Sequence, residues 1–261
     1  MSHPSIRLIR DGAVATLVLD RPDKHNAMTF AMWRALPELV AEAEADTAVK
    51  VMVVRGGGDT AFSAGADIAE FENLYATAEA ARAYNAAVRG GLAALETAAK
   101  PSIALVNGLC VGGGCGIALA CDLRFAAEGA RFGITPAKLG LVYAYPDTKR
   151  LVDTVGPARA KDLLFSGRLV GAREALGFGL IDRIAPADRL AGILEEYLAM
   201  LVGASQYSVR AAKRIIRGVN EGVPADDNAL RAVFEGAFEG EDFREGYRAF
   251  LEKRPPRFTW R

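Results

Sequence analysis

Three consecutive glycines, at positions 112–114, constrain the fold of this chain more than any other feature of its sequence. They lie between an apolar segment that favours a strand, Ile103 to Val106, and one that favours a helix, Ile117 to Ala120. Such a junction directs unpaired N–H groups and the positive end of a helix dipole toward one point. A second glycine corner, Phe-Ser-Ala-Gly-Ala-Asp-Ile at positions 62–68, lies upstream. Two corners of this kind can hold one oxygen atom from two sides.

Each corner also has a purely structural interpretation. Gly65 permits a tight bend, and Asp67 can cap a helix that begins near Ile68, so the first corner alone is typical of an ordinary strand-to-helix turn. The small residues of the second corner can simply allow close packing. The occurrence of both corners in one chain is the more specific signal, and it favours a binding site for a negatively charged oxygen.

The composition excludes several classes of function. The chain has 261 residues and a hydrophobic fraction of 51%, enough for a sizeable core. Basic and acidic residues balance at 32 each, so no net charge attracts nucleic acid or an anionic membrane. No apolar run approaches the ~20 residues of a membrane span, and the first residues lack the apolar segment of a signal peptide. We expect a soluble, cytoplasmic protein with no nucleic-acid or membrane partner.

The cysteine and histidine content argues against metal or redox chemistry. Cys110, Cys115 and Cys121 are odd in number and lie in apolar surroundings, which favours buried free thiols in a reducing cytoplasm. With only two histidines in the chain, a histidine-rich metal site is not expected. We therefore predict no bound metal.

The hydrophobic pattern predicts alternating strands and helices, followed by a helical tail. We expect an α/β layered core over residues 1–189 and a helical region over residues 190–261. The last helix carries an apolar stripe of Phe243, Tyr247, Phe250 and Leu251. The expected elements of the core are a hairpin at 6–9 and 13–19, a helix capped by Thr29 that extends to about Ala45, strands at 51–54 and 123–126, and a loop at 132–147.

Ordered motifs along most of the chain resemble the crotonase (enoyl-CoA hydratase/isomerase) superfamily. Beyond the two glycine corners, the motifs that carry the resemblance are Arg21–Pro22 with Asn26–Ala27, Lys100–Pro101, Asn107–Gly108, Cys121–Leu123, Phe132–Gly133, Leu139–Gly140, Arg150–Leu151, Ala175 with Gly179–Asp182, Glu241–Asp242, Glu245–Gly246 and Phe250–Arg254. The resemblance implies a ClpP/crotonase-like spiral of ββα units and a C-terminal region that forms trimers, which in the family often pair into hexamers. It also implies an acyl-CoA substrate and no separate cofactor, because CoA is part of the substrate.

By the same resemblance, the two corners form an oxyanion hole for the thioester carbonyl. Its donors are the backbone N–H groups of Ala66 and Gly113. The residues implied to bind CoA are Ala64, Asp67 and Ile68 through their backbone, with Lys24 and His25 near the phosphates. A solvated surface position remains an equally simple interpretation of Lys24.

The sequence departs from the family's hydratases where the catalytic acids belong. By motif position, Gly116 and Ala137 stand in the places of the two glutamates that flank a water molecule, and Ala144 in the place of an isomerase carboxylate. A positioned acid or base typically contributes 10²–10⁴-fold to the rate. The ordinary hydratase mechanism is therefore disfavoured.

Decarboxylation needs only the oxyanion hole, because departure of CO₂ itself generates the enolate. The segment at 135–143 also resembles Thr-Pro-x-x-Leu-Gly-x-x-Tyr of methylmalonyl-CoA decarboxylases, in which the tyrosine helps to orient the substrate carboxylate. Tyr143 occupies that place here, although it can equally pack against the acyl tail. The match is incomplete, since those decarboxylases have histidine where this chain has Ala66.

Two other hypotheses remain open. The first is a hydratase or isomerase with a relocated acid or base, for which Asp147, Glu70 and Glu72 are the candidates. Asp147 is also placed to cap a helix, and the two glutamates to face solvent. The second is an acyl-CoA binder that has lost catalysis, for which we expect an apolar pocket with no polar group besides the two amides.

Overall fold

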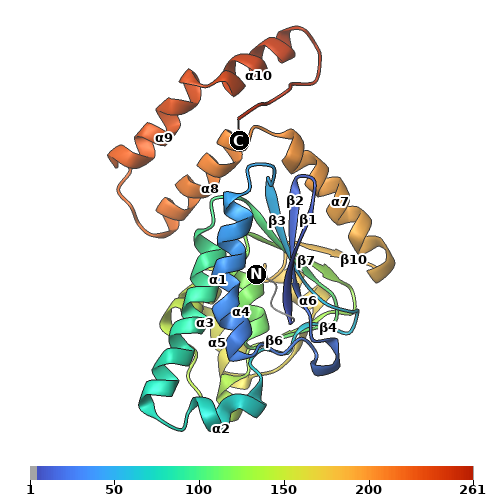
Figure 1. Cartoon of the computed structure of the whole chain (residues 1–261), viewed down its shortest axis with the longest axis vertical. Coiled ribbons are helices and arrows are strands. Elements are labelled where there is room, and N and C mark those ends of the chain that lie inside the picture. Colours follow the sequence, from blue (N-terminus) through green and yellow to red (C-terminus); the bar gives the residue numbers. More distant parts are fainter. Residues whose placement is uncertain (1–4, 261) are drawn as a thin grey trace.

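The computed structural model describes residues 5–260 and shows two sheets with helices packed around them (Figure 1). The elements of the core are β1 (Ile6–Asp11), β2 (Val14–Leu19), η1 (Pro22–Lys24), α1 (Phe30–Ala45), β3 (Val51–Gly56), β4 (Ala61–Ser63), η2 (Ile68–Glu70), α2 (Phe71–Leu74), α3 (Ala78–Thr97), β5 (Ser102–Val106), β6 (Leu109–Val111), α4 (Gly113–Ala120), β7 (Leu123–Ala127), β8 (Arg131–Gly133), η3 (Pro136–Leu139), α5 (Tyr145–Ser166), β9 (Val170–Gly171), α6 (Ala172–Gly177) and β10 (Arg183–Ala185). The helices α7 (Ala187–Gly203), α8 (Gln206–Asn220), α9 (Asn228–Glu239) and α10 (Glu241–Leu251) follow.

The chain winds between the two sheets as a spiral. The larger sheet has the strand order β1-β2-β3-β5-β7-β10, and the smaller has β4-β6-β8-β9. Successive strands thus alternate between the sheets: the first strand of each pair lies in the large sheet and the second in the small one, for the pairs β3 and β4, β5 and β6, and β7 and β8. Apart from the β1–β2 hairpin and the β8–β9 pair, neighbouring strands are parallel. This arrangement confirms the predicted spiral of ββα units.

Helix α1 forms where the sequence predicts it. The Thr29 hydroxyl accepts a hydrogen bond from the N–H of Met32 at 3.2 Å and so caps the first turn. The buried residues of α1 recur at helical spacing and include Met32, Trp33 and Leu36. In Figure 1, α1 and α3 run side by side on one face of the large sheet, and α4 lies in the interior beside them.

Helix α4 begins four residues earlier than predicted, at Gly113 rather than Ile117, and the short strand β6 precedes it. Every residue of α4 after Gly113 is buried. A side chain at Gly114 would collide with the backbone of Ser63, so the glycines let the first turn of α4 pack directly against β4. The predicted loop at 132–147 is also wrong in part, because β8, η3 and the first turn of α5 lie within it.

The predicted division after residue 189 falls inside α7. The apolar side of this helix, with Leu190, Leu194 and Leu198, packs against the large sheet, and so α7 belongs with the core. Helices α9 and α10 instead project beyond the core, with α8 between them and the sheet (Figure 1).

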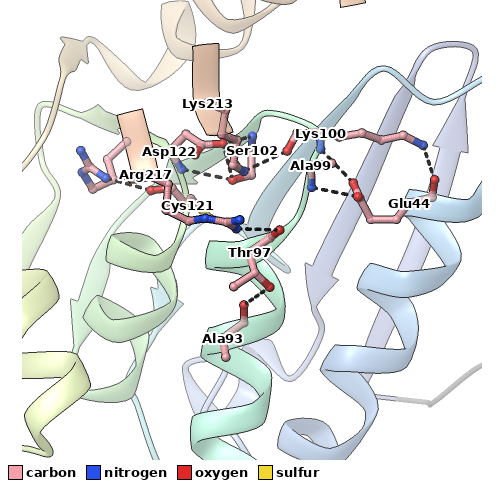
Figure 2. Close-up of polar contacts among 11 residues, drawn as sticks. Glu44, Ala93, Thr97, Ala99, Lys100, Ser102, Cys121, Asp122, Lys213 and Arg217 are labelled. Atoms are coloured by element: carbon pink, nitrogen blue, oxygen red, sulfur yellow. Dashed lines mark hydrogen bonds and ion pairs between the residues drawn. The ribbon is translucent and has the colours of Figure 1, made fainter. Parts of the chain in front are cut away.

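A polar cluster joins α8 to the core, as Figure 2 shows. The Lys213 ammonium donates to the Lys100 carbonyl at 3.0 Å and forms an ion pair with Asp122 at 2.8 Å. The same Asp122 oxygen accepts a hydrogen bond from the Ser102 N–H at 2.7 Å. One lysine therefore connects the C-terminal region to the starts of β5 and β7.

Two expectations from composition can be compared with the structure. All three cysteines are buried and free, as predicted. Among residues 5–260, no helix combines the length and apolar character that crossing a bilayer requires.

Candidate active site

The two glycine corners meet at a cavity of about 400 Å³. Ala66 and Gly113 line it from opposite corners, α3 forms one wall, and the segment from η3 to the first turn of α5 forms another. The closeness of the corners follows from Gly65, whose φ of 89° is favourable only for glycine. A side-chain carbon there would lie 2.7 Å from the Val111 carbonyl oxygen and 2.9 Å from the Gly113 nitrogen.

In the first corner, the Ala66 amide has no hydrogen-bond partner among the described residues. The N–H of Ala64 donates to the His25 carbonyl at 2.9 Å, that of Gly65 to the Ser63 hydroxyl at 3.2 Å, and that of Asp67 to the Met28 carbonyl at 2.9 Å. Within the described part of the chain, the Ala66 N–H between them has no backbone acceptor. The amides on both sides of Ala66 are thus bonded within the protein, and Ala66, whose own amide has no such bond among the described residues, lines the cavity.

The second corner leaves an amide at the start of a helix. Gly112, with a φ of 54°, precedes α4 and donates its N–H to the Gly133 carbonyl at 2.8 Å. Gly113 is the first residue of α4, so its N–H has no partner within the helix. The positive end of the helix dipole adds to its attraction for negative charge. Ala66 and Gly113, both with amides that lack a backbone partner among residues 5–260, thus line one cavity from two corners.

The residues predicted to bind CoA lie around the first corner. Asp67 accepts a hydrogen bond from the Ala69 N–H at 3.2 Å, as the predicted cap of η2, and forms an ion pair with Arg21 at 2.8 Å. Ala64 and Ile68 line the cavity. Lys24 and His25 are exposed and lie outside its lining, although the His25 carbonyl holds Ala64.

The Tyr143 hydroxyl lies beside Gly116, the position where the resemblance implies a glutamate in hydratases. A side-chain carbon added to Gly116 would be 3.6 Å from the Tyr143 hydroxyl oxygen and 3.5 Å from a methyl carbon of Leu92. The hydroxyl is buried and has no hydrogen-bond partner among residues 5–260. Burial, reinforced by the charge of Asp147, raises the pKa of Tyr143 well above its ordinary value. A buried, neutral hydroxyl without a partner in the described part of the chain therefore lies beside Gly116, in a residue that lines the cavity.

Asp147 is the acidic residue that the structure brings to the cavity. Its carboxylate forms an ion pair with Arg150 at 2.9 Å, and Arg150 also pairs with Glu96 at 2.7 Å. Burial raises the pKa of Asp147, while the Arg150 guanidinium acts in the opposite direction. The interpretation of Asp147 as a helix cap is wrong, because Ala144 occupies the cap position and the carboxylate binds the Arg150 side chain instead.

The other two acidic candidates lie outside the cavity lining. Glu70 accepts a hydrogen bond from the Phe30 N–H at 2.7 Å and thereby satisfies a free amide at the start of α1. Glu72 is exposed on α2, as a solvated helix face predicts.

Several lining residues were not predicted from the sequence. Phe71, Tyr75 and Tyr84 form an aromatic wall, with ring centroids 5.1–6.3 Å apart. Arg89 reaches the cavity from α3. The spacing of Tyr84, Val88 and Leu92 along α3 is a signal for one buried helix face, but it does not reveal which cavity the face borders.

Two mainly parallel sheets, wound as ββα units beside two touching glycine corners, define the crotonase fold. The family model described as enoyl-CoA hydratase/isomerase matches residues 10–261. The crotonyl-CoA hydratase of Syntrophomonas wolfei is 34% identical over 99% of each chain, and the short-chain-enoyl-CoA hydratase of Clostridium acetobutylicum is 34% identical over 97% of each. A crystal structure of an enoyl-CoA hydratase/isomerase family protein from Hyphomonas neptunium superimposes with a TM-score of 0.96, at 47% identity and 98% coverage of each chain. The chain therefore belongs to the enoyl-CoA hydratase/isomerase, or crotonase, superfamily.

Proposed function

We propose that this member of the family is an acyl-CoA lyase that stabilises a thioester enolate between the amides of Ala66 and Gly113. The observation that carries the proposal is the pair of unpaired N–H groups at one cavity, supplied by corners in direct contact. An enolate concentrates negative charge on the thioester oxygen, and fixed amides stabilise such a charge more than the neutral ground state. Each amide contributes roughly 3–4 kcal/mol.

Decarboxylation is the reaction we favour. Loss of CO₂ leaves its electron pair on the α-carbon, so the enolate forms without removal of a carbon-bound proton. Gly116 and Ala137 supply no carboxylate for hydration. The neutral Tyr143 hydroxyl beside Gly116 can donate a hydrogen bond to the substrate carboxylate and orient it. A proton source then completes the reaction at the α-carbon.

Asp147 supports a second candidate, a hydratase or isomerase with a relocated acid or base. Its carboxylate lines the cavity, and a pKa raised by burial suits a group that must both take and return a proton. A shift of a double bond requires only one such group, since the same carboxylate can serve both carbons. In a hydration, this single acid would have to both position and activate a water molecule. Isomerisation therefore fits the cavity better than hydration does.

One experiment distinguishes these reactions. The protein is incubated separately with methylmalonyl-CoA, crotonyl-CoA and a 3-enoyl-CoA, and the products are followed by mass spectrometry and by the absorbance of the conjugated enoyl thioester. We expect release of CO₂ from methylmalonyl-CoA, slowed roughly 10-fold or more in Y143F and much less in D147N. Conversion of either enoyl-CoA, abolished in D147N, would support the second candidate instead.

The pH dependence provides a further distinction within the same experiment. A catalytic Asp147 must ionise to act as a base, and its raised pKa places the acidic fall in rate at a higher pH than an ordinary carboxyl group would. Decarboxylation that does not use Asp147 should lack this fall. Binding of all three thioesters without turnover would contradict both reactions and support a non-catalytic binder.

The remaining assignments extend the proposal. CoA is proposed to lie along Ala64, Asp67 and Ile68, with its phosphates toward the exposed Lys24 and His25.

A homotrimer or a dimer of trimers is proposed because α9 and α10 expose a row of aromatic rings that a single chain leaves uncovered. Buried free thiols support a cytoplasmic location. No metal or separate cofactor enters the proposed reaction.

A further inference from the structure

Arg89 is the cationic residue of the active-site cavity, and its guanidinium is unpaired. It extends from α3, whose Tyr84, Val88 and Leu92 line the same cavity. Among residues 5–260 it makes no ion pair and no side-chain hydrogen bond, and its side chain is exposed. Solvated arginines are common on helices, so whether Arg89 has a role in binding depends on the other groups that line the cavity.

Its position places it near the acyl end of the site. Leu92 follows Arg89 by three residues, so the two side chains lie on neighbouring turns of the same helix face. Leu92 contacts the space above Gly116, where the Tyr143 hydroxyl also lies. Gly116 is in turn three residues beyond Gly113, so this space is about one helical turn, ~5 Å, from the oxyanion amide. Arg89 lies about one turn of α3, ~5 Å, from Leu92, and an extended arginine side chain can span that distance.

The charges around the cavity leave Arg89 without a counter-ion. The acidic group of the lining, Asp147, is already paired with Arg150, which is paired with Glu96 as well. The lining also carries two amides, the Tyr143 hydroxyl and the Arg89 guanidinium as donors, and the uncharged side chains of Asn85 and Thr135, which can donate or accept. Because the positive charge of Arg89 is not balanced by a carboxylate of the lining, the cavity favours a ligand that carries an anionic group in addition to its thioester oxygen.

We propose that Arg89 binds a carboxylate on the acyl part of the substrate, and hence that the substrate class is the CoA thioesters of dicarboxylic acids. This inference rests on the proposed acyl-CoA function and names a specificity residue for it. Arg89 and Tyr143 together hold the carboxylate while Ala66 and Gly113 hold the thioester oxygen. A phosphate of CoA offers the same anionic chemistry, and the test separates the two sources.

The test compares succinyl-CoA with butyryl-CoA, which share CoA and chain length and differ in the terminal carboxylate. Dissociation constants are measured by isothermal titration calorimetry for the wild type, R89Q, R89K and the control R82Q, which changes an exposed arginine of α3 outside the cavity lining. We expect the wild type and R82Q to bind succinyl-CoA more tightly than butyryl-CoA. In R89Q, succinyl-CoA should bind roughly 10- to 100-fold more weakly, with butyryl-CoA within about twofold. R89K should retain part of the preference.

Other results would overturn the proposal. Equal weakening of both ligands in R89Q would assign Arg89 to a CoA phosphate, and no change in either would make it a solvated surface residue. A wild type without preference for succinyl-CoA would also exclude the carboxylate site. Because these measurements require no turnover, they stay separate from the proposed reaction: decarboxylation can fail while the preference persists, and the reverse also holds.

Discussion

At the scale of single residues, the site depends on where side chains are absent. Gly65 allows two corners to touch, and Gly116 leaves room beside the Tyr143 hydroxyl. The resemblance implies a carboxylate at the latter position in hydratases, and in the proposed function its absence disfavours hydration. Absent side chains thus set how closely the two corners approach and how much space lies beside Tyr143.

The substitution Gly65→Ala tests the contact between the corners. The new methyl group would press on the Val111 carbonyl and the Gly113 amide at a φ of 89°, which alanine adopts only with strain. We expect a loss of about 1–3 kcal/mol in the free energy of unfolding and at least a ~10²-fold loss of kcat from displacement of one amide. Urea unfolding measures the first effect, and turnover of the proposed substrate methylmalonyl-CoA measures the second.

The matched control is Gly90→Ala, on α3, where an added methyl group meets no atom within 4 Å. There we expect stabilisation by about 0.5–1 kcal/mol, because alanine favours the helix, and unchanged kcat. If Gly65→Ala kept the stability and kcat of Gly90→Ala, the close approach of the two corners would not be required for folding or turnover.

At the scale of elements, local patterns were predicted better than contacts between distant segments. The Thr29 cap, the hairpin and the Asp67 cap are encoded within a few residues, and the structure confirms them. The early start of α4 was missed because glycines disfavour a helix unless, as here, tertiary packing requires them. Arg89 and the Asp147–Arg150 pair were missed because their places depend on how α3, α4 and α5 pack together.

The joint between α8 and the core gives a prediction at this scale. Lys213 is only 14% exposed in its ion pair with Asp122, and it also donates to the Lys100 carbonyl. Replacement by methionine keeps the apolar stem and removes these charged contacts (Figure 2). We expect K213M to lower the free energy of unfolding by about 1–2 kcal/mol and to accelerate proteolysis between α8 and α9.

R173M is the control, since the ion pair of Arg173 with Glu128 is exposed on both sides and lies away from α8. Exposed pairs contribute less than about 1 kcal/mol, so its unfolding should change little. Similar losses in both variants would mean that Lys213 acts as an ordinary surface charge and does not anchor α8.

At the scale of the whole molecule, the cavity is formed by the core, whereas α9 and α10 project from it and expose aromatic side chains. Phe234 and Phe238 of α9 and Phe243 and Tyr247 of α10 form a chain of ring contacts, with centroids 5.2–5.6 Å apart. Between 44% and 59% of each residue remains exposed. Contiguous aromatic surface of this kind favours association with another chain. The helices that project in Figure 1 are therefore expected to carry the contacts of a trimer.

The double substitution F234S/F238S tests this expectation. Each phenylalanine contributes roughly 1.5–3 kcal/mol when its exposed ring becomes buried, so loss of two rings per chain should shift a trimer toward monomers at micromolar concentration. Light scattering coupled to size-exclusion chromatography measures the mass, with E235S as a polar control on the same helix. The core lies apart from these rings, so circular dichroism should show the helices and sheets retained. If F234S/F238S remains a trimer, the subunits associate through another surface. If the wild type is a monomer, the aromatic row does not join copies of this chain.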